Sequence, residues 1–80
     1  MTRQLTVYHR TGCHLCEDMI AQLLALQQQF GFSLQQLDIQ DDPELEAAYG
    51  TKVPVLLADG HEICHYFLDQ VALSRYFGTG

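Results

Sequence analysis

Hydrophobic residues fall into several short apolar runs and one long helical stripe. Short runs rich in β-branched and aliphatic side chains, such as residues 5–8, are typical of strands. From Leu15 to Phe30 apolar residues follow an i, i+4, i+5, i+8 pattern, which predicts an amphipathic helix that ends at Gly31. The same criteria predict further strands at residues 34–39, 53–58 and 61–67.

Capping residues predict two more helices and a hairpin turn. Asp42 is suited to cap a short helix that ends at Gly50, and Asp69 is suited to cap a last helix near the C-terminus. The pair Asp59-Gly60 lies between the last two predicted strands. This dipeptide favours a two-residue type I′ turn, so those strands are expected to form a hairpin.

The resulting order of elements is β-α-β-α-β-β-α. The first two strands are joined by a helical crossover and are therefore expected to be parallel, whereas the last two are expected to be antiparallel. The sequence thus predicts an α/β fold with a four-stranded mixed sheet flanked by helices. A chain of 80 residues is expected to form a single domain over residues 1–80.

Charge and composition narrow the partners of such a domain. The chain carries ten Asp and Glu residues against four Lys and Arg, a formal charge of -6, which disfavours nucleic acid and anionic membranes as partners. No signal-peptide pattern opens the sequence, and its apolar runs are too short for a membrane span, so a cytoplasmic location is expected. In that reducing compartment the three cysteines are expected to be catalytic, metal-binding or buried.

Two of these cysteines, Cys13 and Cys16, are three residues apart where the first predicted helix begins. The unpaired N–H groups and the dipole of a helix N-terminus stabilise a thiolate, which is the reactive form of cysteine. Arg10 and a protonated His14 can add to this effect. Cys13 is therefore the candidate nucleophile, and Cys16, one turn deeper, is the candidate resolving thiol.

A metal site is the alternative interpretation of the same cysteines. Cys13 and Cys16 could join Cys64 and either His61 or His65 in a Cys3His zinc set. Side chains of a strand alternate between its two faces, so His61 and Cys64 are expected to point apart. We therefore expect the pair to work as a redox pair without a metal.

The chain resembles the glutaredoxin-like members of the thioredoxin-fold superfamily. The segments that carry the resemblance are YHRTGCHLC (residues 8–16), LDIQDDP (residues 37–43), KVPVL (residues 52–56) and the pair Asp59-Gly60. The resemblance implies a thioredoxin/glutaredoxin-like fold and a cis peptide bond before Pro54, opposite the cysteine pair. It also implies that the backbone of Val53 pairs with the substrate and that the basic residue Arg10 contacts the thiolate or substrate.

Two features depart from the glutaredoxin pattern. His14-Leu15 separates the two cysteines where glutaredoxins usually carry Pro-Tyr, and Cys64-His65 occupies the place of a Gly-Gly pair that holds glutathione. The second replacement predicts weak glutathione binding, although the dithiol chemistry is retained. Cys64 itself has two interpretations, as a small buried hydrophobic residue or as a third thiol near the site.

The sequence therefore predicts a thiol–disulfide oxidoreductase in which Cys13 attacks, Cys16 resolves, and Val53 and Pro54 position the substrate. It would need no cofactor other than the redox-active disulfide Cys13-Cys16, with glutathione as a less favoured ligand. The expected partners are a disulfide-bearing protein or a small thiol, together with a reductant such as a thioredoxin-reductase-like protein or glutathione. The alternative is a non-catalytic thioredoxin-fold binding module or a Cys/His metal-binding domain.

Overall fold

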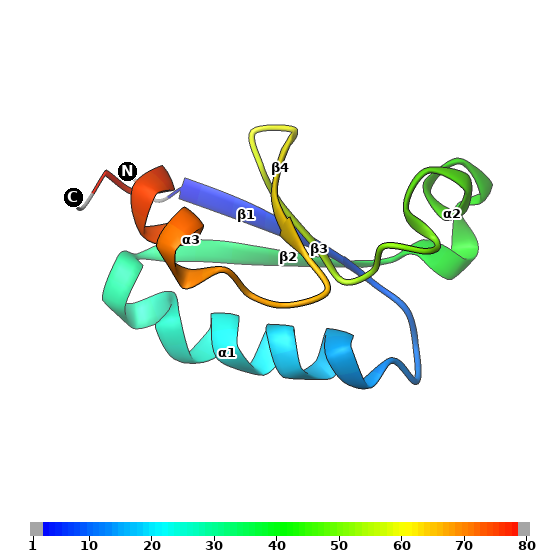
Figure 1. Cartoon of the computed structure of the whole chain (residues 1–80), viewed down its shortest axis with the longest axis horizontal. Helices are drawn as coiled ribbons and strands as arrows, with labels where there is room; N and C mark the ends of the chain where they lie inside the picture. Colours follow the sequence, from blue (N-terminus) through cyan, green and yellow to red (C-terminus); the bar gives the residue numbers. More distant parts are fainter. Residues whose placement is uncertain (1–2, 79–80) are drawn as a thin grey trace.

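The computed structural model describes residues 3–78, and its centre is a mixed four-stranded sheet (Figure 1). The strands lie in the order β2-β1-β3-β4, with β1 and β2 parallel and the other neighbouring pairs antiparallel. This arrangement confirms the predicted mixed sheet and its strand directions. The strand bounds are β1 (Arg3–His9), β2 (Phe32–Asp38), β3 (Val55–Ala58) and β4 (His61–His65).

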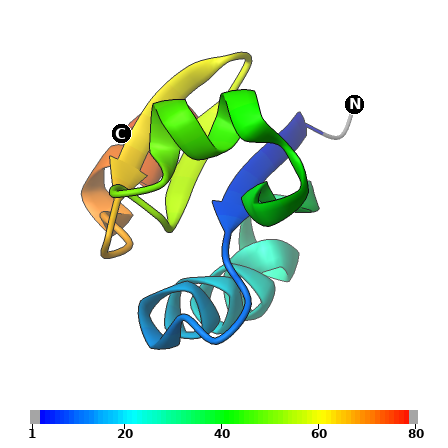
Figure 2. The same ribbon diagram turned by 90° about the vertical axis from the view of Figure 1, so that its right-hand side faces the viewer.

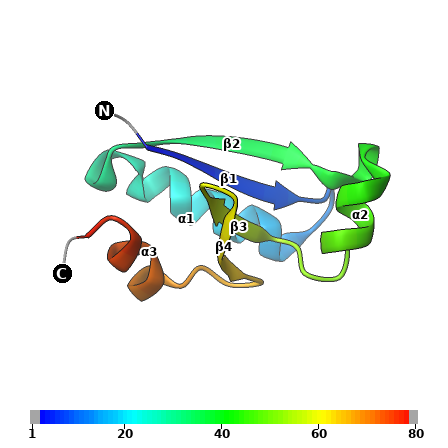
Figure 3. The same cartoon turned by 90° about the horizontal axis from the view of Figure 1, so that it is seen from above.

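The helices and the sheet together form the predicted order of elements. The helices are α1 (His14–Phe30), α2 (Pro43–Tyr49) and α3 (Gln70–Tyr76), with a single 3-10 turn η1 (Ile39–Asp41) before α2. Viewed from the side and from above, α1 runs along the sheet, while α2 lies beyond the ends of β1 and β2 (Figures 1 and 3). Within residues 3–78, none of the helices has the length and apolar character that crossing a membrane requires.

One face of the sheet carries the hydrophobic core. Leu5 and Val7 alternate along β1 and are both fully buried, in contact with Met19 and Leu23 of α1 and with Leu73 of α3. Residues two apart on a strand share a face, and residues three to four apart on a helix share a stripe, so this pattern of burial follows directly from the sequence periodicity. The core fixes α1, and with it the cysteine pair at its start, against the sheet.

Helix α2 is held by side-chain contacts and contributes no fully buried residue. Tyr49 packs its ring against Tyr8 of β1, with the ring centroids 4.8 Å apart. Glu46 forms an ion pair with Arg10, which follows β1 directly. The view along the sheet shows α2 across the end from which the chain leaves β1 toward α1 (Figure 2). This helix therefore anchors the segment that leads to Cys13.

The predicted turn is confirmed, and several predicted strand ends are wrong. The second strand runs from Phe32 to Asp38 and not from residue 34 to 39, because the chain turns into η1 at Ile39. Asp59 and Gly60 have φ angles of 53° and 80°, as a type I′ turn requires. The third strand begins at Val55 and not at residue 53, because Pro54 has no N–H to donate to a neighbouring strand. The fourth strand ends at His65 and not at residue 67, because Tyr66 turns the chain with a φ of 66°. Its N–H still bonds the Pro54 carbonyl, in register with the neighbouring pair Val55 and His65.

Candidate functional site

The cysteine pair lies where α1 begins, with Cys13 as the N-cap residue. Cys13 has extended backbone angles, and its Sγ accepts a hydrogen bond from the backbone N–H of Cys16 at 3.1 Å. An N-cap side chain normally satisfies one of the free N–H groups of the first turn with oxygen, and here sulfur does so. A sulfur in this position gains stabilisation as a thiolate from the N–H group and from the helix dipole. The predicted placement of Cys13 just before the first helical residue is confirmed.

The loop before Cys13 is held from two sides. Thr11 donates its hydroxyl hydrogen to an Asp38 carboxylate oxygen at 2.8 Å, which links the loop to the end of β2. The backbone N–H of Cys13 donates to the carbonyl of Arg10 at 3.3 Å and closes a tight turn. Hydrogen bonds from the Gln40 backbone N–H and from Thr11 lower the pKa of Asp38, so this anchor is ionised near neutral pH.

Cys16 lies one turn into α1 and is buried. Its exposed fraction is 1%, whereas Cys13 is partly accessible. Burial and the hydrogen-bonding contact with the Cys13 side chain together raise the pKa of Cys16 to about 12, from an ordinary value of 9.0. Cys16 is thus a protonated, sheltered thiol beside a partly exposed one. The predicted division between an attacking and a resolving cysteine stays a prediction.

Arg10 lies next to the cysteine loop, but its guanidinium group is directed at α2. It forms an ion pair with Glu46 and donates a second hydrogen bond to the Gly50 carbonyl at 3.2 Å. The hydrogen bond with Glu46 is the main cause of the raised pKa of Arg10. The structure therefore assigns Arg10 an anchoring contact. Its predicted contact with the thiolate or substrate stays a prediction.

His14 is the first residue of α1, and its side chain is 96% exposed. Its Nδ1 atom lies 3.7 Å from a Glu17 carboxylate oxygen, one turn along the same helix. A protonated His14 would thus be drawn toward Glu17 as well as toward Cys13. Its predicted influence on Cys13 stays a prediction.

The segment before β3 contains the cis peptide bond that the resemblance implied. The Val53–Pro54 peptide bond is cis, and Pro54 is fully buried. The carbonyl of Pro54 accepts a hydrogen bond at 2.9 Å from the backbone N–H of Tyr66, in the loop between β4 and α3. The loop that carries Val53 and Pro54 is therefore tied to the loop that follows β4.

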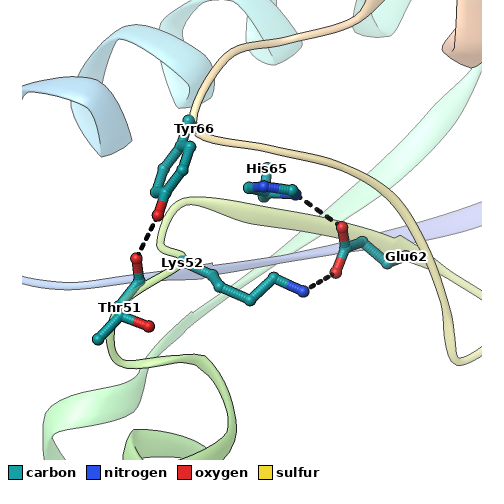
Figure 4. Close-up of polar contacts among 5 residues, drawn as sticks. All are labelled: Thr51, Lys52, Glu62, His65 and Tyr66. Atoms are coloured by element: carbon teal, nitrogen blue, oxygen red, sulfur yellow. Dashed lines mark hydrogen bonds and ion pairs between the residues drawn. The ribbon is translucent and has the colours of Figure 1, made fainter.

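A polar cluster beside this segment did not emerge from the sequence (Figure 4). Glu62 accepts a hydrogen bond from Lys52 at 2.6 Å and contacts His65 Nδ1 at 2.8 Å. The Tyr66 hydroxyl donates to the Thr51 carbonyl at 2.6 Å. The two halves of the cluster come from segments ten or more residues apart, so no local spacing points to it. The only sequence signal for this cluster was the opposite charge of Lys52 and Glu62, which lie on segments that face each other in the fold.

Cys64 lies in the hydrophobic core on β4, opposite Leu56 of β3. It is 9% exposed, and burial raises its pKa, so it is a neutral thiol. This supports the interpretation of Cys64 as a small hydrophobic residue. Within residues 3–78 no group of three or more His, Cys, Asp and Glu side chains is placed to hold a metal ion. The Cys3His set of the alternative interpretation is thus not assembled.

A groove of about 430 Å³ runs between the cysteine loop and α1. Cys16 forms part of its wall, together with apolar side chains of α1 and polar groups of the loop. The lining residues are His9, Arg10, Thr11, Gly12, Cys16, Glu17, Ile20, Ala21, Leu24 and Gln36. The buried thiol is therefore close to solvent on this side of the helix.

Comparison with known families agrees with this geometry. Residues 4–78 match the family described as the glutaredoxin-like domain (DUF836). The chain therefore belongs to the glutaredoxin-like domain family, and its fold is of the thioredoxin type.

Several proteins of known structure or sequence are similar to the chain. Protein Ne2328 from Nitrosomonas europaea shares 45% identity over 95% of this chain and 92% of its own, with a TM-score of 0.87. The XcR50 protein of X. campestris shares 35% identity over 95% and 97%, with a TM-score of 0.72. Rv0508 of Mycobacterium tuberculosis is 31% identical over 84% of this chain and 74% of its own length. Thioredoxin 1 of Thermosipho africanus, at 18% identity over 95% and 96% with a TM-score of 0.64, shares the fold.

Proposed function

We propose that this protein is a thiol–disulfide oxidoreductase that uses Cys13 and Cys16 as its redox pair. The observation that carries the proposal is the 3.1 Å hydrogen bond from the Cys16 N–H to the Cys13 sulfur at a helix N-terminus. It places a partly exposed sulfur where negative charge is stabilised, next to a buried thiol with a raised pKa. Membership of the glutaredoxin-like family supports the same assignment.

The reaction begins when the Cys13 thiolate attacks one sulfur of a substrate disulfide. A new S–S bond forms between Cys13 and the substrate, and the other substrate sulfur leaves as a thiolate that takes a proton from solvent. The Cys13 sulfur then no longer carries negative charge. The contribution of the Cys13 thiolate to the raised Cys16 pKa is thereby removed at the moment when Cys16 must react.

In the second step the Cys16 thiol releases its proton to solvent and attacks the Cys13 sulfur. The Cys13–Cys16 disulfide forms, and the second substrate thiol leaves, so the substrate has gained two electrons and the cysteine pair has lost two. A thiol reductant must return the pair to the reduced form. We propose a thioredoxin-reductase-like protein or glutathione in this role, in the reducing cytoplasm.

Val53 and Pro54 are proposed to orient the substrate beside the pair. The support is the hydrogen bond from the Tyr66 N–H that holds the Pro54 carbonyl in place. A fixed backbone edge at this point could pair with an extended substrate segment. Glutathione is proposed as a poor ligand, because Cys64-His65 replaces the Gly-Gly pair that holds glutathione in glutaredoxins. The residues on either side of Cys64-His65, Ile63 and Tyr66, are also bulky. Weak turnover in an assay coupled to glutathione reductase is the corresponding expectation.

The test is to trap the mixed disulfide. The variant Cys16→Ser should accumulate a covalent adduct with a disulfide substrate on a non-reducing gel and in the intact mass, since the resolving thiol is missing. Cys13→Ser should form no adduct, and Cys64→Ala is the matched control that should retain reductase activity. If only the Cys13→Ser variant accumulated the adduct, Cys16 would be the attacking cysteine and Cys13 the resolving one. Full activity in both variants would instead favour a non-catalytic binding module.

A further inference from the structure

Two aromatic residues that the proposed chemistry does not use form an exposed surface near the first turns of α1. Tyr66 and Phe67, which we call the aromatic ledge, are 40% and 69% exposed in the loop between β4 and α3. The ledge borders a cavity of about 130 Å³ whose other wall is α1. The described residues that line this cavity are Leu15, Asp18, Met19, Gln22, Tyr66, Phe67 and Leu68.

Several links hold the ledge in place (Figure 4). Tyr66 donates its backbone N–H to the Pro54 carbonyl at 2.9 Å and its hydroxyl hydrogen to the Thr51 carbonyl at 2.6 Å. The ring of Tyr66 also contacts the His65 ring, with centroids 4.7 Å apart. His65 in turn contacts Glu62, which accepts a hydrogen bond from Lys52. The ledge is thus linked to the loop that carries the cis proline.

The cavity is close to the reacting sulfur along the chain. Leu15, which lines it, lies between Cys13 and Cys16, and Met19 lies one turn further along α1. The cavity therefore lies at the end of α1 that Cys13 caps, where a residue next to a substrate cysteine could reach it. An exposed aromatic pair at such a point is unusual for a surface loop, because large apolar side chains normally gain free energy by burial.

Size and charge point to the kind of group that fills the cavity. A volume of about 130 Å³ is below the roughly 300–1,000 Å³ of typical small-molecule sites, so it suits a single side chain. Of the described residues that line it, Asp18 alone carries a formal charge, and that charge is negative. The net charge of the chain, -6, has the same sign. These features disfavour an anionic tripeptide such as glutathione and favour an apolar side chain with a basic neighbour.

We propose that the aromatic ledge and its cavity bind the side chain next to the disulfide cysteine of an extended polypeptide substrate. The preferred neighbour is aromatic or large and aliphatic, and a lysine or arginine close to it pairs with Asp18. This inference rests on the proposed thiol–disulfide exchange and names its substrate class. Phe67 supplies the contact surface, and Tyr66 is a positioning residue that holds it against the proline loop.

The experiment compares matched peptide disulfides in the Cys16→Ser background, where each attack yields a stable adduct. Short symmetrical disulfide peptides carry phenylalanine or glycine on both sides of the cysteine, and lysine or glutamate one position further out. An aromatic contact predicts adduct formation about fivefold to tenfold faster for phenylalanine than for glycine. Lysine peptides should react faster than glutamate peptides, and the difference should shrink at high salt.

Surface variants then assign this selectivity to the ledge. Phe67→Ser should bring the phenylalanine-to-glycine ratio close to one, and Phe67→Leu should restore part of it. Val71→Ser removes an equally exposed apolar side chain, 63% exposed in α3, that does not line the cavity, so it should keep the ratio. Asp18→Asn should remove the preference for lysine over glutamate. Tyr66→Phe loses the bond to the Thr51 carbonyl and should reduce the phenylalanine-to-glycine ratio partly.

The outcomes separate this inference from the proposed function. Equal rates for all peptides, an unchanged ratio in Phe67→Ser, or faster reaction with glutathione disulfide than with the phenylalanine peptides would overturn the ledge as a specificity site. Each of these results would leave the redox pair intact. Failure to form an adduct even with hydroxyethyl disulfide would overturn the proposed function and the ledge with it. Faster reaction of glutamate peptides would overturn the role of Asp18.

Discussion

The backbone N–H of Cys16 donates to the sulfur of Cys13 at 3.1 Å, so one cysteine of the pair uses its backbone to stabilise the side chain of the other. The Cys16 side chain is meanwhile buried and has a raised pKa. The same three-residue spacing therefore yields two thiols of different character. One is a partly accessible thiol at the helix N-cap, and the other is buried in the first turn of the helix.

The buried position of Cys16 predicts a specific pattern of alkylation. A pKa of about 12 in place of 9.0 implies a thiolate fraction about a thousandfold smaller at pH 8. Iodoacetamide at this pH should label Cys13 first, and peptide mapping should show little modification of Cys16. In concentrated urea both cysteines should react at similar rates, which is the control for intrinsic reactivity. Equal labelling of the native protein would contradict the burial of Cys16.

The raised pKa of Cys16 also has a consequence for stability at alkaline pH. The folded state disfavours the Cys16 thiolate, whereas the unfolded chain ionises near the ordinary value of 9.0. The contribution of Cys16 is therefore fully present below about pH 9 and is lost as the pH rises toward about 12. Urea unfolding between pH 8 and pH 10.5 should show a steeper loss of unfolding free energy in the parent chain than in Cys16→Ala. Parallel curves would contradict this expectation.

Mild oxidation should produce one specific disulfide. Cys13 and Cys16 lie within one helical turn, whereas Cys64 is buried in the core on β4. Mass spectrometry of oxidised and alkylated protein should therefore find a Cys13–Cys16 bridge and a reduced Cys64. The bridge should be reversed by dithiothreitol, and Cys64→Ala should form it equally well. A bridge that includes Cys64 would require the core to open and would contradict this geometry.

Glu62 should stabilise the fold in a pH-dependent way. A hydrogen bond from Lys52 and a smaller effect of the hydrogen bond with His65 lower the pKa of Glu62 from its ordinary value of 4.5. Its contribution is therefore present above about pH 4.5 and is lost as the pH falls through the lower folded value. Glu62→Gln should lower the unfolding free energy by about 0.5–1 kcal/mol at pH 7, as is typical of a partly exposed pair.

A double-mutant cycle isolates this interaction. In a Lys52→Met background the effect of Glu62→Gln at pH 7 should shrink, since the main partner of the carboxylate is gone. The difference between parent chain and Glu62→Gln should also approach zero near pH 3. An effect of equal size at pH 3 and pH 7 would show that Glu62 acts through packing and not through its charge.

The sequence predicts the sheet and the start of α1 well, because both depend on local patterns. Alternation at Leu5 and Val7, the Asp59-Gly60 turn and the helical stripe after Leu15 each encode one element within a few residues. The position of Cys13 at the helix start follows from the same patterns. Local information thus suffices to place the two cysteines.

The surroundings of the pair depend on contacts between distant segments, and these were not predictable. Arg10 meets Glu46 and Gly50, about forty residues away, through the position of α2. Tyr66 adopts a left-handed φ that its own residue type disfavours, and its hydrogen bonds to the segment around Pro54 hold it there. The end of β4 and the aromatic ledge both follow from that turn, so both were missed.

The last prediction concerns Gly50, where two physical effects oppose each other. Gly50 has φ -55° and ψ -31°, a conformation open to any residue, so Gly50→Ala should stabilise by about 0.4–1 kcal/mol if chain entropy alone mattered. However, an added Cβ would collide with the Glu46 carbonyl oxygen and lie 2.8 Å from its carboxylate oxygen. It would also lie 3.4 Å from Arg10 Nη2, in the ion pair that anchors α2.

We expect the steric effect to dominate, because the nearest obstacle is backbone and cannot rotate away. Gly50→Ala should lower the unfolding free energy by about 1–3 kcal/mol, the usual cost of overpacking. The matched control is Ala47→Ser on the exposed side of the same helix, which should change it by less than about 0.5 kcal/mol. Urea denaturation followed by circular dichroism measures both. A Gly50→Ala variant more stable than the parent chain would show that α2 shifts freely, and that the Arg10 contacts with Glu46 and Gly50 do not hold it in place.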